Sequence, residues 1–542
     1  MPVSDRPPTS SNHYDYIVVG AGSAGCIVAA RLALNSRVLL LEAGEPADRN
    51  PETLSADGFK YAFANDDLMW HRMSAPQEAC GKRRLYLGTG RGMGGSGAVN
   101  GMVYTRGDKR DFELWPKGWQ WQDLEPAFTA VEETLGVQPR PSTAFARQFI
   151  EAAVESGFQH KDGLNDGDLA NVVGCNDMNY AGDQRRSAYC AYIHEQKLPN
   201  LNIETRCHVE RLIFDENNKA VAVEYQQHRQ SRRAEIGQEV ILCAGALETP
   251  KLLMLSGVGP KADLEKLGIN VNVDAPGIGQ NLHDHPNVCL FYRTRDKVDF
   301  QYPQVYGFNA ADGQPEDAPN TCYVCYAAPA SIKQSMLRML PVLALPGRLH
   351  QIKSLRAILR GLIHAAFALP SLKRYVSGVF GIVVILGKPA SRGSIRLASN
   401  NPADPAIIDP AYYACEEDRQ TLVAGIKQAR EIARQPALAG ARPLSAGARN
   451  ITGDKLWKWI HGASMTTFHF CGSCRMGNDP DSPVSPDLKV KGLNNVRVAD
   501  ASVIPAIPVS ALNAPSMMIG YRAADFILAE QTDEQTSKRN AA

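Results

Sequence analysis

Residues 14–42 constrain the fold of this 542-residue chain more than any other stretch. Residues 16–19 are a short apolar run rich in β-branched side chains, which is typical of a strand buried on both faces. Three glycines in the spacing G-x-G-x-x-G follow, then a helix-forming stretch and a second apolar run at 38–41. This order predicts a parallel βαβ unit with a glycine-rich turn between its first strand and its helix.

Each glycine of this turn has a separate physical task. Gly20 allows the tight turn, Gly22 lets backbone N–H groups approach a pyrophosphate, and Gly25 lets helix and strand pack closely. Glu42 lies 22 positions after Gly20, where a carboxylate can accept hydrogen bonds from an adenosine ribose. The positive end of the helix dipole faces the phosphates. The stretch therefore predicts a dinucleotide site.

Length and composition limit the number of domains, the partners and the compartment that we expect for this chain. At about 150 residues per domain, the length suggests roughly two to four units. With 58 basic against 57 acidic residues, the overall charge gives no reason to expect a nucleic-acid partner. Twelve cysteines are too few for a disulfide scaffold, and a reducing cytosol fits best. Without an N-terminal signal peptide or a run of about 18 uncharged apolar residues, we expect a cytoplasmic protein.

A second glycine-rich stretch covers residues 90–101. So many glycines do not suit a regular helix or strand, because each costs backbone entropy and contributes no packing. A flexible linker is one interpretation, but a linker would be rich in Ser and polar on both sides. Here the stretch continues into the apolar residues 102–104, which favours a backbone wrapped around a planar ligand.

Further along the chain, residues 202–222 predict a β-hairpin with its turn at Asn217 and Asn218. Residues 239–245 predict another buried strand that leads into a third glycine turn. We expect a helix after it, with Thr249 as its N-cap and Gly257 at its end.

The glycine-rich segments 90–101 and 245–259 resemble the two signatures of the glucose-methanol-choline (GMC) flavoprotein oxidoreductases. The only departure is Met93, where the family usually has Leu, Ile or Val. The resemblance extends over nearly the whole chain, through 276–285, 469–477 and 494–524. Within the family it is nearest to the choline-dehydrogenase-like and bacterial alcohol dehydrogenase or oxidase branch.

The resemblance implies FAD rather than NAD, and an α/β fold with two interleaved units. One is a Rossmann-like FAD-binding domain, and the other is an α+β substrate-binding domain built on an antiparallel sheet. The implied FAD-binding segments are 12–155, 201–285 and 466–530. The substrate-binding segments are 156–200 and 286–465, with disordered tails at 1–11 and 531–542.

His469 and Asn513 occupy the family's two catalytic positions. Oxidation of an alcohol by hydride transfer leaves a proton on oxygen, and an imidazole can accept it at neutral pH. We therefore predict His469 as the general base and Asn513 as a partner that orients the substrate oxygen through its amide. The alternative for His469 is an ordinary core histidine, and His461 is the competing candidate, interpreted here as a residue behind the site or on the surface.

The family motifs also imply the residues that contact the cofactor. These are Gly20, Gly22, Ser23, Ala24, Gly25, Glu42, Ala43, Trp70, Arg91, Gly94, Gly95, Asn100, Gly101, Met102, Val103, Val209, Asp500 and Ala501. Some relatives attach their flavin covalently through a histidine directly before the Asn of the first signature. Val99 stands there, so we expect non-covalent FAD.

Two further patterns have competing interpretations. The Cys-x-x-Cys pairs Cys322/Cys325 and Cys471/Cys474 have zinc-ligand spacing, but their apolar and flavin-motif settings argue against a metal, and we predict none. Residues 318–403 contain no Asp or Glu. Within them, segment 331–374 pairs an apolar stripe (Ile352, Leu355, Leu359, Leu362, Ile363, Ala366) with a basic flank (Lys353, Arg356, Arg360, His364). Either the segment contacts the inner face of a membrane, or it only caps the substrate domain.

Together these features predict an FAD-dependent enzyme that oxidises a primary alcohol to an aldehyde and passes electrons to a quinone or another acceptor. The nearest alternative is an oxidase that produces hydrogen peroxide. Other classes on the same fold are a non-redox lyase and a non-catalytic FAD-binding protein.

Overall fold

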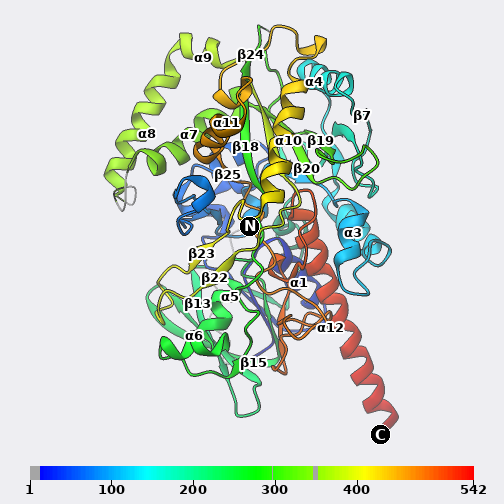
Figure 1. Cartoon of the computed structure of the whole chain (residues 1–542). Helices are drawn as coiled ribbons and strands as arrows, with labels where there is room; N and C mark the ends of the chain where they lie inside the picture. Colours follow the sequence, from blue (N-terminus) through cyan, green and yellow to red (C-terminus); the bar gives the residue numbers. More distant parts are fainter. Residues whose placement is uncertain (1–12, 296, 346–348, 350–351, 542) are drawn as a thin grey trace.

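The computed structural model describes residues 13–295, 297–345, 349 and 352–541. These residues form two β-sheets with helices around them (Figure 1). The first sheet lies in the lower half of Figure 1 and the second in the upper half. The tail predicted at 1–11 lies outside the described residues.

The first sheet has the strand order β12-β2-β1-β15-β14-β13, and β26 pairs with β15. Its strands are β1 (His13–Val19), β2 (Val38–Leu41), β12 (Leu201–Glu204), β13 (Cys207–Phe214), β14 (Ala220–Gln227), β15 (Gln230–Leu242) and β26 (Val496–Val498). The pairs β12–β2, β2–β1, β1–β15 and β15–β26 are parallel. Val19 lies opposite both Leu41 and Leu242, so these strands end at one edge of the sheet. In open α/β sheets ligands bind at that edge.

Helix α1 (Ser23–Leu32) follows β1 and packs against α12 (Asn513–Ala541), so segments from the early and the late part of the sequence lie side by side. Glycine permits both close contacts of α1. A Cβ on Gly25 would lie 1.9 Å from the carbonyl oxygen of Gly20, and one on Gly520 would lie 2.6 Å from that of Ala24. The predicted βαβ unit is therefore present, with α12 covering its helix.

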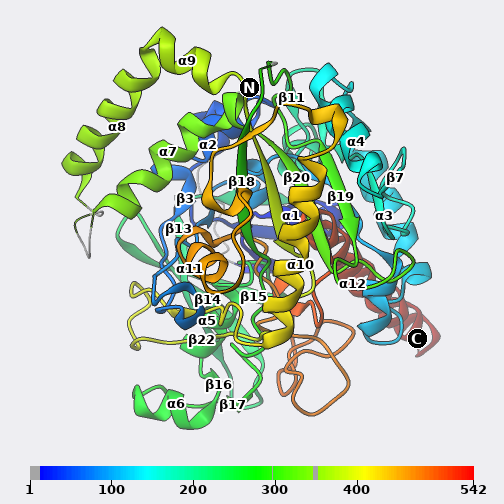
Figure 2. The same ribbon diagram turned by 45° about the horizontal axis from the view of Figure 1, so that its top comes forward.

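The second sheet has the order β24-β18-β21-β20-β19-β8-β7, and β25 pairs with β18. Its strands are β7 (Gln159–His160), β8 (Val172–Cys175), β18 (Pro286–Arg293), β19 (Val305–Asn309), β20 (Thr321–Ala327), β21 (Val379–Leu386), β24 (Arg442–Pro443) and β25 (Met465–Thr466). All pairs except β7–β8 are antiparallel. Helix α10 (Glu416–Ile432) packs on this sheet against β21 (Figure 2).

The remaining longer helices are α3 (Trp121–Leu135), α4 (Ala144–Glu155), α5 (Thr249–Leu255), α6 (Lys261–Lys266) and α11 (Gly453–Ala463). Short elements are α2 (Phe59–Ala62), β3 (Met69–Trp70), β4 (Thr89–Gly90), β5 (Val103–Tyr104), β6 (Gln138–Pro139), β9 (Asp177–Met178), β10 (Tyr180–Ala181), β11 (Gln184–Arg185), β16 (Val258–Gly259), β17 (Val273–Asp274), β22 (Ser394–Arg396) and β23 (Ile407–Asp409).

Three local expectations differ from the structure. The hairpin is formed by 207–214 and 220–227, because 201–204 instead pairs in parallel with β2. The N-cap of α5 is Glu248, and the hydroxyl of Thr249 donates to the Asp500 carboxylate at 2.6 Å instead. Residues 531–541 continue α12, where the sequence predicted a disordered tail. Residues with good helix propensity continue the helix there, because its preceding turns are already formed and packed.

Helices α7 (Ala328–Ala344), α8 (Lys353–Ala368) and α9 (Pro370–Val376) form an arm beside the second sheet. In Figures 1 and 2, α8 and α9 are its outer helices and α7 lies between them and the body. Among the described helices, none taken singly is long and apolar enough to cross a membrane. Only α8 and α9 taken together, with a bend of 83° between them, pass that test of length and composition.

Asp66 ties this arm to the body. Its carboxylate accepts hydrogen bonds from Arg338 of α7 at 2.8 Å and from Arg360 of α8 at 2.8 and 3.0 Å, and Arg356 lies 3.3 Å away. Burial alone would raise the pKa of Asp66, but the hydrogen bond from Arg360 and the charges of the arginines outweigh it and lower the pKa.

Asp66→Asn should therefore destabilise the protein, by about 1–3 kcal/mol at neutral pH, because it leaves the buried Arg338 without a counter-charge. Since the folded-state pKa is depressed, this stabilisation exists above the unfolded pKa of about 3.9 and disappears as the pH falls through the folded value. Thermal unfolding of wild type and variant at pH 7 and at low pH measures the difference. Asp67→Asn, on the same turn but exposed, is the control. Equal melting temperatures for Asp66→Asn and wild type at pH 7 would contradict this role.

Candidate active site

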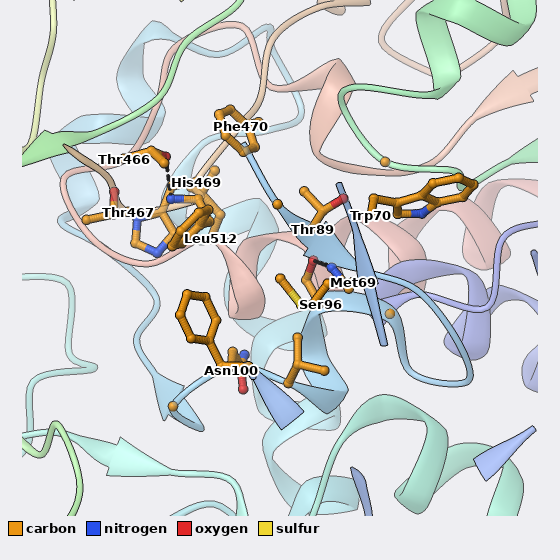
Figure 3. A pocket seen from close by; sticks show the side chains of 18 of the residues that line it. Met69, Trp70, Thr89, Ser96, Asn100, Thr466, Thr467, His469, Phe470 and Leu512 are labelled. Carbon is orange, nitrogen blue, oxygen red and sulfur yellow. Dashed lines mark hydrogen bonds between the residues drawn. The ribbon is translucent and has the colours of Figure 1, made fainter. Parts of the chain in front are cut away.

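A single cavity of about 1020 Å³ joins the carboxyl edge of the first sheet to the face of the second (Figure 3). Gly22 and His469 both line it. Figure 3 shows His469 beside Thr466, Thr467 and Leu512, with Trp70 and Thr89 on the far side and Asn100 below. The glycine turn from the start of the chain and the histidine from its end thus share one cavity.

Most of the residues predicted to contact the cofactor line this cavity. They are Gly20, Gly22, Ser23, Ala24, Glu42, Ala43, Trp70, Gly95, Asn100, Gly101, Val103, Val209, Asp500 and Ala501. The backbone of Gly22 has φ −79°, and a Cβ there would have only one neighbour within 4 Å, the carbonyl oxygen of Cys243 at 3.9 Å. Gly22 also precedes α1 without a side-chain cap, so the first N–H groups of that helix remain available to an anion. The turn thus fits the pyrophosphate of a dinucleotide.

Glu42 has a more structural role than the sequence indicated. Its buried carboxylate accepts backbone N–H groups from Ala21 at 2.9 Å, Gly44 at 2.8 Å and Gly92 at 2.9 Å. Burial raises the pKa of Glu42, and these donors oppose the rise. A carboxylate has about four acceptor sites, so about one remains for a ribose hydroxyl. Glu42 therefore joins the two glycine-rich segments besides bordering the cavity.

Four of the predicted contact residues do not line the cavity. Gly25 packs against the backbone of Gly20 and the side chain of Cys243, and the N–H of Gly94 donates to the carbonyl of Ala21 at 2.7 Å. Arg91 stacks on Trp70 and donates to the carbonyl of Ala43 at 3.1 Å. Met102 is fully buried. The structure therefore places these four in the walls behind the cavity.

Asn513, the first residue of α12, has an unused donor at the cavity. Its Oδ1 accepts a hydrogen bond from the Ser23 hydroxyl at 2.8 Å, which orients the amide. Its Nδ2 is buried and has no hydrogen-bond partner among the described residues. Because an unpaired buried N–H₂ group is costly, this group is suited to bind a ligand oxygen.

His469 is paired with a second histidine. Its Nδ1 lies 2.9 Å from Nδ1 of His285, and the two rings are nearly perpendicular. Burial lowers the pKa of His469 to about 4. Burial lowers the pKa of His285 well below its ordinary value, the proximity of His469 acts in the same direction, and the carbonyls of Gly387 and Pro508 oppose the shift. Both imidazoles are therefore neutral at pH 7.

Asp284 holds the backbone of this pair. Its carboxylate accepts the N–H of His469 at 2.7 Å and hydrogen bonds from the hydroxyls of Tyr412 and Thr466. Burial raises the pKa of Asp284 to about 6. Thr467 donates its hydroxyl to the carbonyl of His285 at 2.6 Å. The segment 284–285 thus fixes the position of His469 from the neighbouring strand.

The sequence analysis gave no role to Asp284, His285 or Arg185. The first two belong to a run of titratable residues, His283-Asp284-His285, whose burial was the missing information. Arg185 is buried and donates to the carbonyls of Gly97 and Asn100 at 2.9 and 2.7 Å. It holds the glycine-rich loop in place, although nothing near position 185 in the sequence indicates this contact.

Apolar side chains predominate in the cavity walls near His469. These walls come from β18, β20, α7 and 465–470, and they include Cys289, Phe291, Tyr326, Met336, Met339 and Phe470 beside the polar Asn287, Gln334 and Thr467. The acidic residues that line the cavity are Glu42, Glu248 and Asp500, which all lie beside the glycine turns. The end near His469 therefore suits an uncharged, apolar molecule.

The structure also places His461 and the cysteines that the sequence analysis considered as alternatives. His461 does not line the cavity and packs on Trp457 instead. Among the described residues, no group of three or more His, Cys, Asp or Glu is placed to hold a metal ion, and all twelve cysteines are free.

The chain has clear relatives among known proteins. Family models described as GMC oxidoreductase match residues 14–287 and 389–520. The chain is 33% identical to an alcohol dehydrogenase [acceptor] of Pseudomonas putida, over 95% of this chain and 96% of the relative. It is 32% identical to an oxygen-dependent choline dehydrogenase of Vibrio vulnificus, over 96% and 95%. Its structure is similar to a pyridoxine 4-oxidase from Mesorbium loti, with a TM-score of 0.81 at 29% identity over 94% and 98% of the chains.

Proposed function

This chain belongs to the GMC oxidoreductase family, and from that premise we propose that it oxidises an apolar primary alcohol to the aldehyde, with FAD as its cofactor. One observation carries the proposal: His469 and Asn513, whose Nδ2 is unpaired, line the same cavity as the Gly22 turn. A proton acceptor, an oxygen-binding donor and a dinucleotide cradle are the groups that this reaction requires.

FAD, when bound, supplies the acceptor for the hydride that leaves the carbinol carbon. The chain's own residues handle the substrate oxygen. Nδ2 of Asn513 donates a hydrogen bond to it and orients the alcohol, since Oδ1 is already held by Ser23. Nε2 of His469 accepts the hydroxyl proton, and the apolar walls exclude water from the reacting atoms.

His285 sets the tautomer that this role needs. The contact between the two Nδ1 atoms needs one donor and one acceptor, and we propose that Nδ1 of His285 is the acceptor. Nδ1 of His469 then carries a hydrogen and donates it across the 2.9 Å contact. The lone pair of His469 is consequently on Nε2, where a base needs it.

The lining favours an uncharged alcohol over choline, because the substrate end has no carboxylate to pair with a quaternary ammonium group. One named relative is an alcohol dehydrogenase [acceptor], so we propose a quinone or another acceptor in preference to oxygen, although the other dehydrogenase is described as oxygen-dependent. The alternative is an oxidase that forms hydrogen peroxide, since the similar solved structure is an oxidase.

The test is to mix the FAD-loaded enzyme, under anaerobic conditions, with linear and aromatic primary alcohols and with choline. The visible absorbance of the flavin is then followed. We expect bleaching by apolar alcohols, with kcat/KM rising with chain length because each buried methylene adds about 0.8 kcal/mol. Comparing the rate of hydrogen peroxide release with the rate of dye reduction then distinguishes an oxidase from a dehydrogenase. Failure of every alcohol to bleach the flavin would favour a non-redox or non-catalytic protein.

A further inference from the structure

Exposed apolar side chains are concentrated on the outer helices of the arm and on the residues next to their ends. Fourteen large hydrophobic residues are exposed among the described residues, and six of them lie within residues 349–375. These six, which we call the arm patch, are Leu349, Ile352, Ile358, Leu362, Leu369 and Tyr375. That stretch is about a twentieth of the chain, so the clustering is far above an even distribution. Clustered exposed apolar residues mark an interaction surface.

The arm packs inward with one side of α8 and leaves the patch uncovered. Ile363 is buried, and Arg356 and Arg360 turn toward Asp66. On the outer side, Ile358 and Leu362, one helical turn apart, are 61% and 63% exposed. The basic flank predicted from the sequence is therefore only partly available, because two of its arginines are bound internally.

The charges that remain outside are positive. Lys353, Lys373 and Arg374 are exposed at the two ends of the α8–α9 pair, and residues 318–403 contain no acidic residue. A second copy of the chain on the same patch would bring these cations together with no acidic partner from the arm. A partner with an apolar interior and a negatively charged surface fits the arm patch better than a second copy does.

The arm also borders the cavity. Helix α7 packs against α8, and its residues Ile332, Met336 and Met339 line the cavity wall. A molecule held at the arm patch is therefore separated from the cavity by one helix.

We propose that the arm patch is the binding surface for an anionic lipid bilayer, with α8 and α9 lying at the lipid–water interface. Apolar side chains enter the acyl boundary, and the flanking lysines and arginine contact the headgroups, at about 1 kcal/mol for each basic residue. Delivery of an apolar alcohol from the lipid to the cavity would follow; that step rests on the proposed function, whereas lipid binding does not.

The test is co-sedimentation of the FAD-loaded enzyme with phosphatidylcholine vesicles, with and without phosphatidylglycerol. We expect binding that requires phosphatidylglycerol and weakens in high salt. The double variant Ile358→Glu/Leu362→Glu should bind at least about tenfold more weakly, because each buried Ile or Leu is worth about 1.5–3 kcal/mol. Its FAD content and its activity on a dissolved alcohol should match wild type. Leu114→Glu, at a site 69% exposed elsewhere, is the matched control.

Three results would overturn the proposal. The first is wild-type enzyme that sediments with neither vesicle, and the second is a double variant that sediments as well as wild type. The third is a concentration-dependent dimer in analytical ultracentrifugation that the double variant abolishes, without lipid binding, since the patch would then be covered by a second copy. Because sedimentation needs no turnover, none of these results depends on whether an alcohol is oxidised.

Discussion

Replacing His469 by Gln should slow anaerobic reduction of the bound flavin by an alcohol by about 10²- to 10⁴-fold, while the FAD content stays unchanged. Glutamine can accept a hydrogen bond but cannot take the proton, so the loss should appear in the rate of the chemical step and much less in alcohol binding. Stopped-flow absorbance gives this rate directly.

His461→Gln is the matched control for this variant, because His461 is eight residues away and outside the cavity. It should reduce its flavin at the wild-type rate. In wild type, the low pKa of His469, about 4, keeps the base neutral, so the rate should fall only as the pH drops below about 5. A His469→Gln enzyme within threefold of wild type would remove the proposed base.

Replacing Gly22 by Val should weaken FAD binding by about 10- to 100-fold and leave the apoprotein folded. The backbone at Gly22 is extended, with φ −79° and ψ −166°, so a branched side chain causes no strain. Its added atoms enter the cavity, since the nearest neighbour of a Cβ there is 3.9 Å away. The space they take is the space assigned to the pyrophosphate.

Two measurements separate binding from folding: titration of the apoprotein with FAD, and its melting temperature without FAD. Gly25→Ala is the contrasting variant, because its Cβ would lie 1.9 Å from the Gly20 carbonyl oxygen and should lower the melting temperature of the apoprotein. If Gly22→Val bound FAD as wild type does, the cofactor could not lie on this turn.

The sequence alone determined the features that depend on local chemistry. The βαβ unit follows from strand, glycine and helix patterns within 29 residues, and Gly20 and Gly25 make the tight turn and the close packing expected of them. The motifs also indicated the GMC family, FAD and the histidine that the structure brings to the cavity. Local sequence patterns of this kind predict the folded structure well, because they act through the backbone conformation that each residue favours.

Only the tertiary structure decided which polar groups remain free. Glu42 and Asp66 have carboxylates whose partners lie on distant segments, and His285 meets His469 across 184 positions. The same is true of the arm, where two predicted outer arginines turn inward and leave Ile358 and Leu362 exposed. Such choices depend on contacts between remote parts of the chain, and the order of residues does not encode them locally.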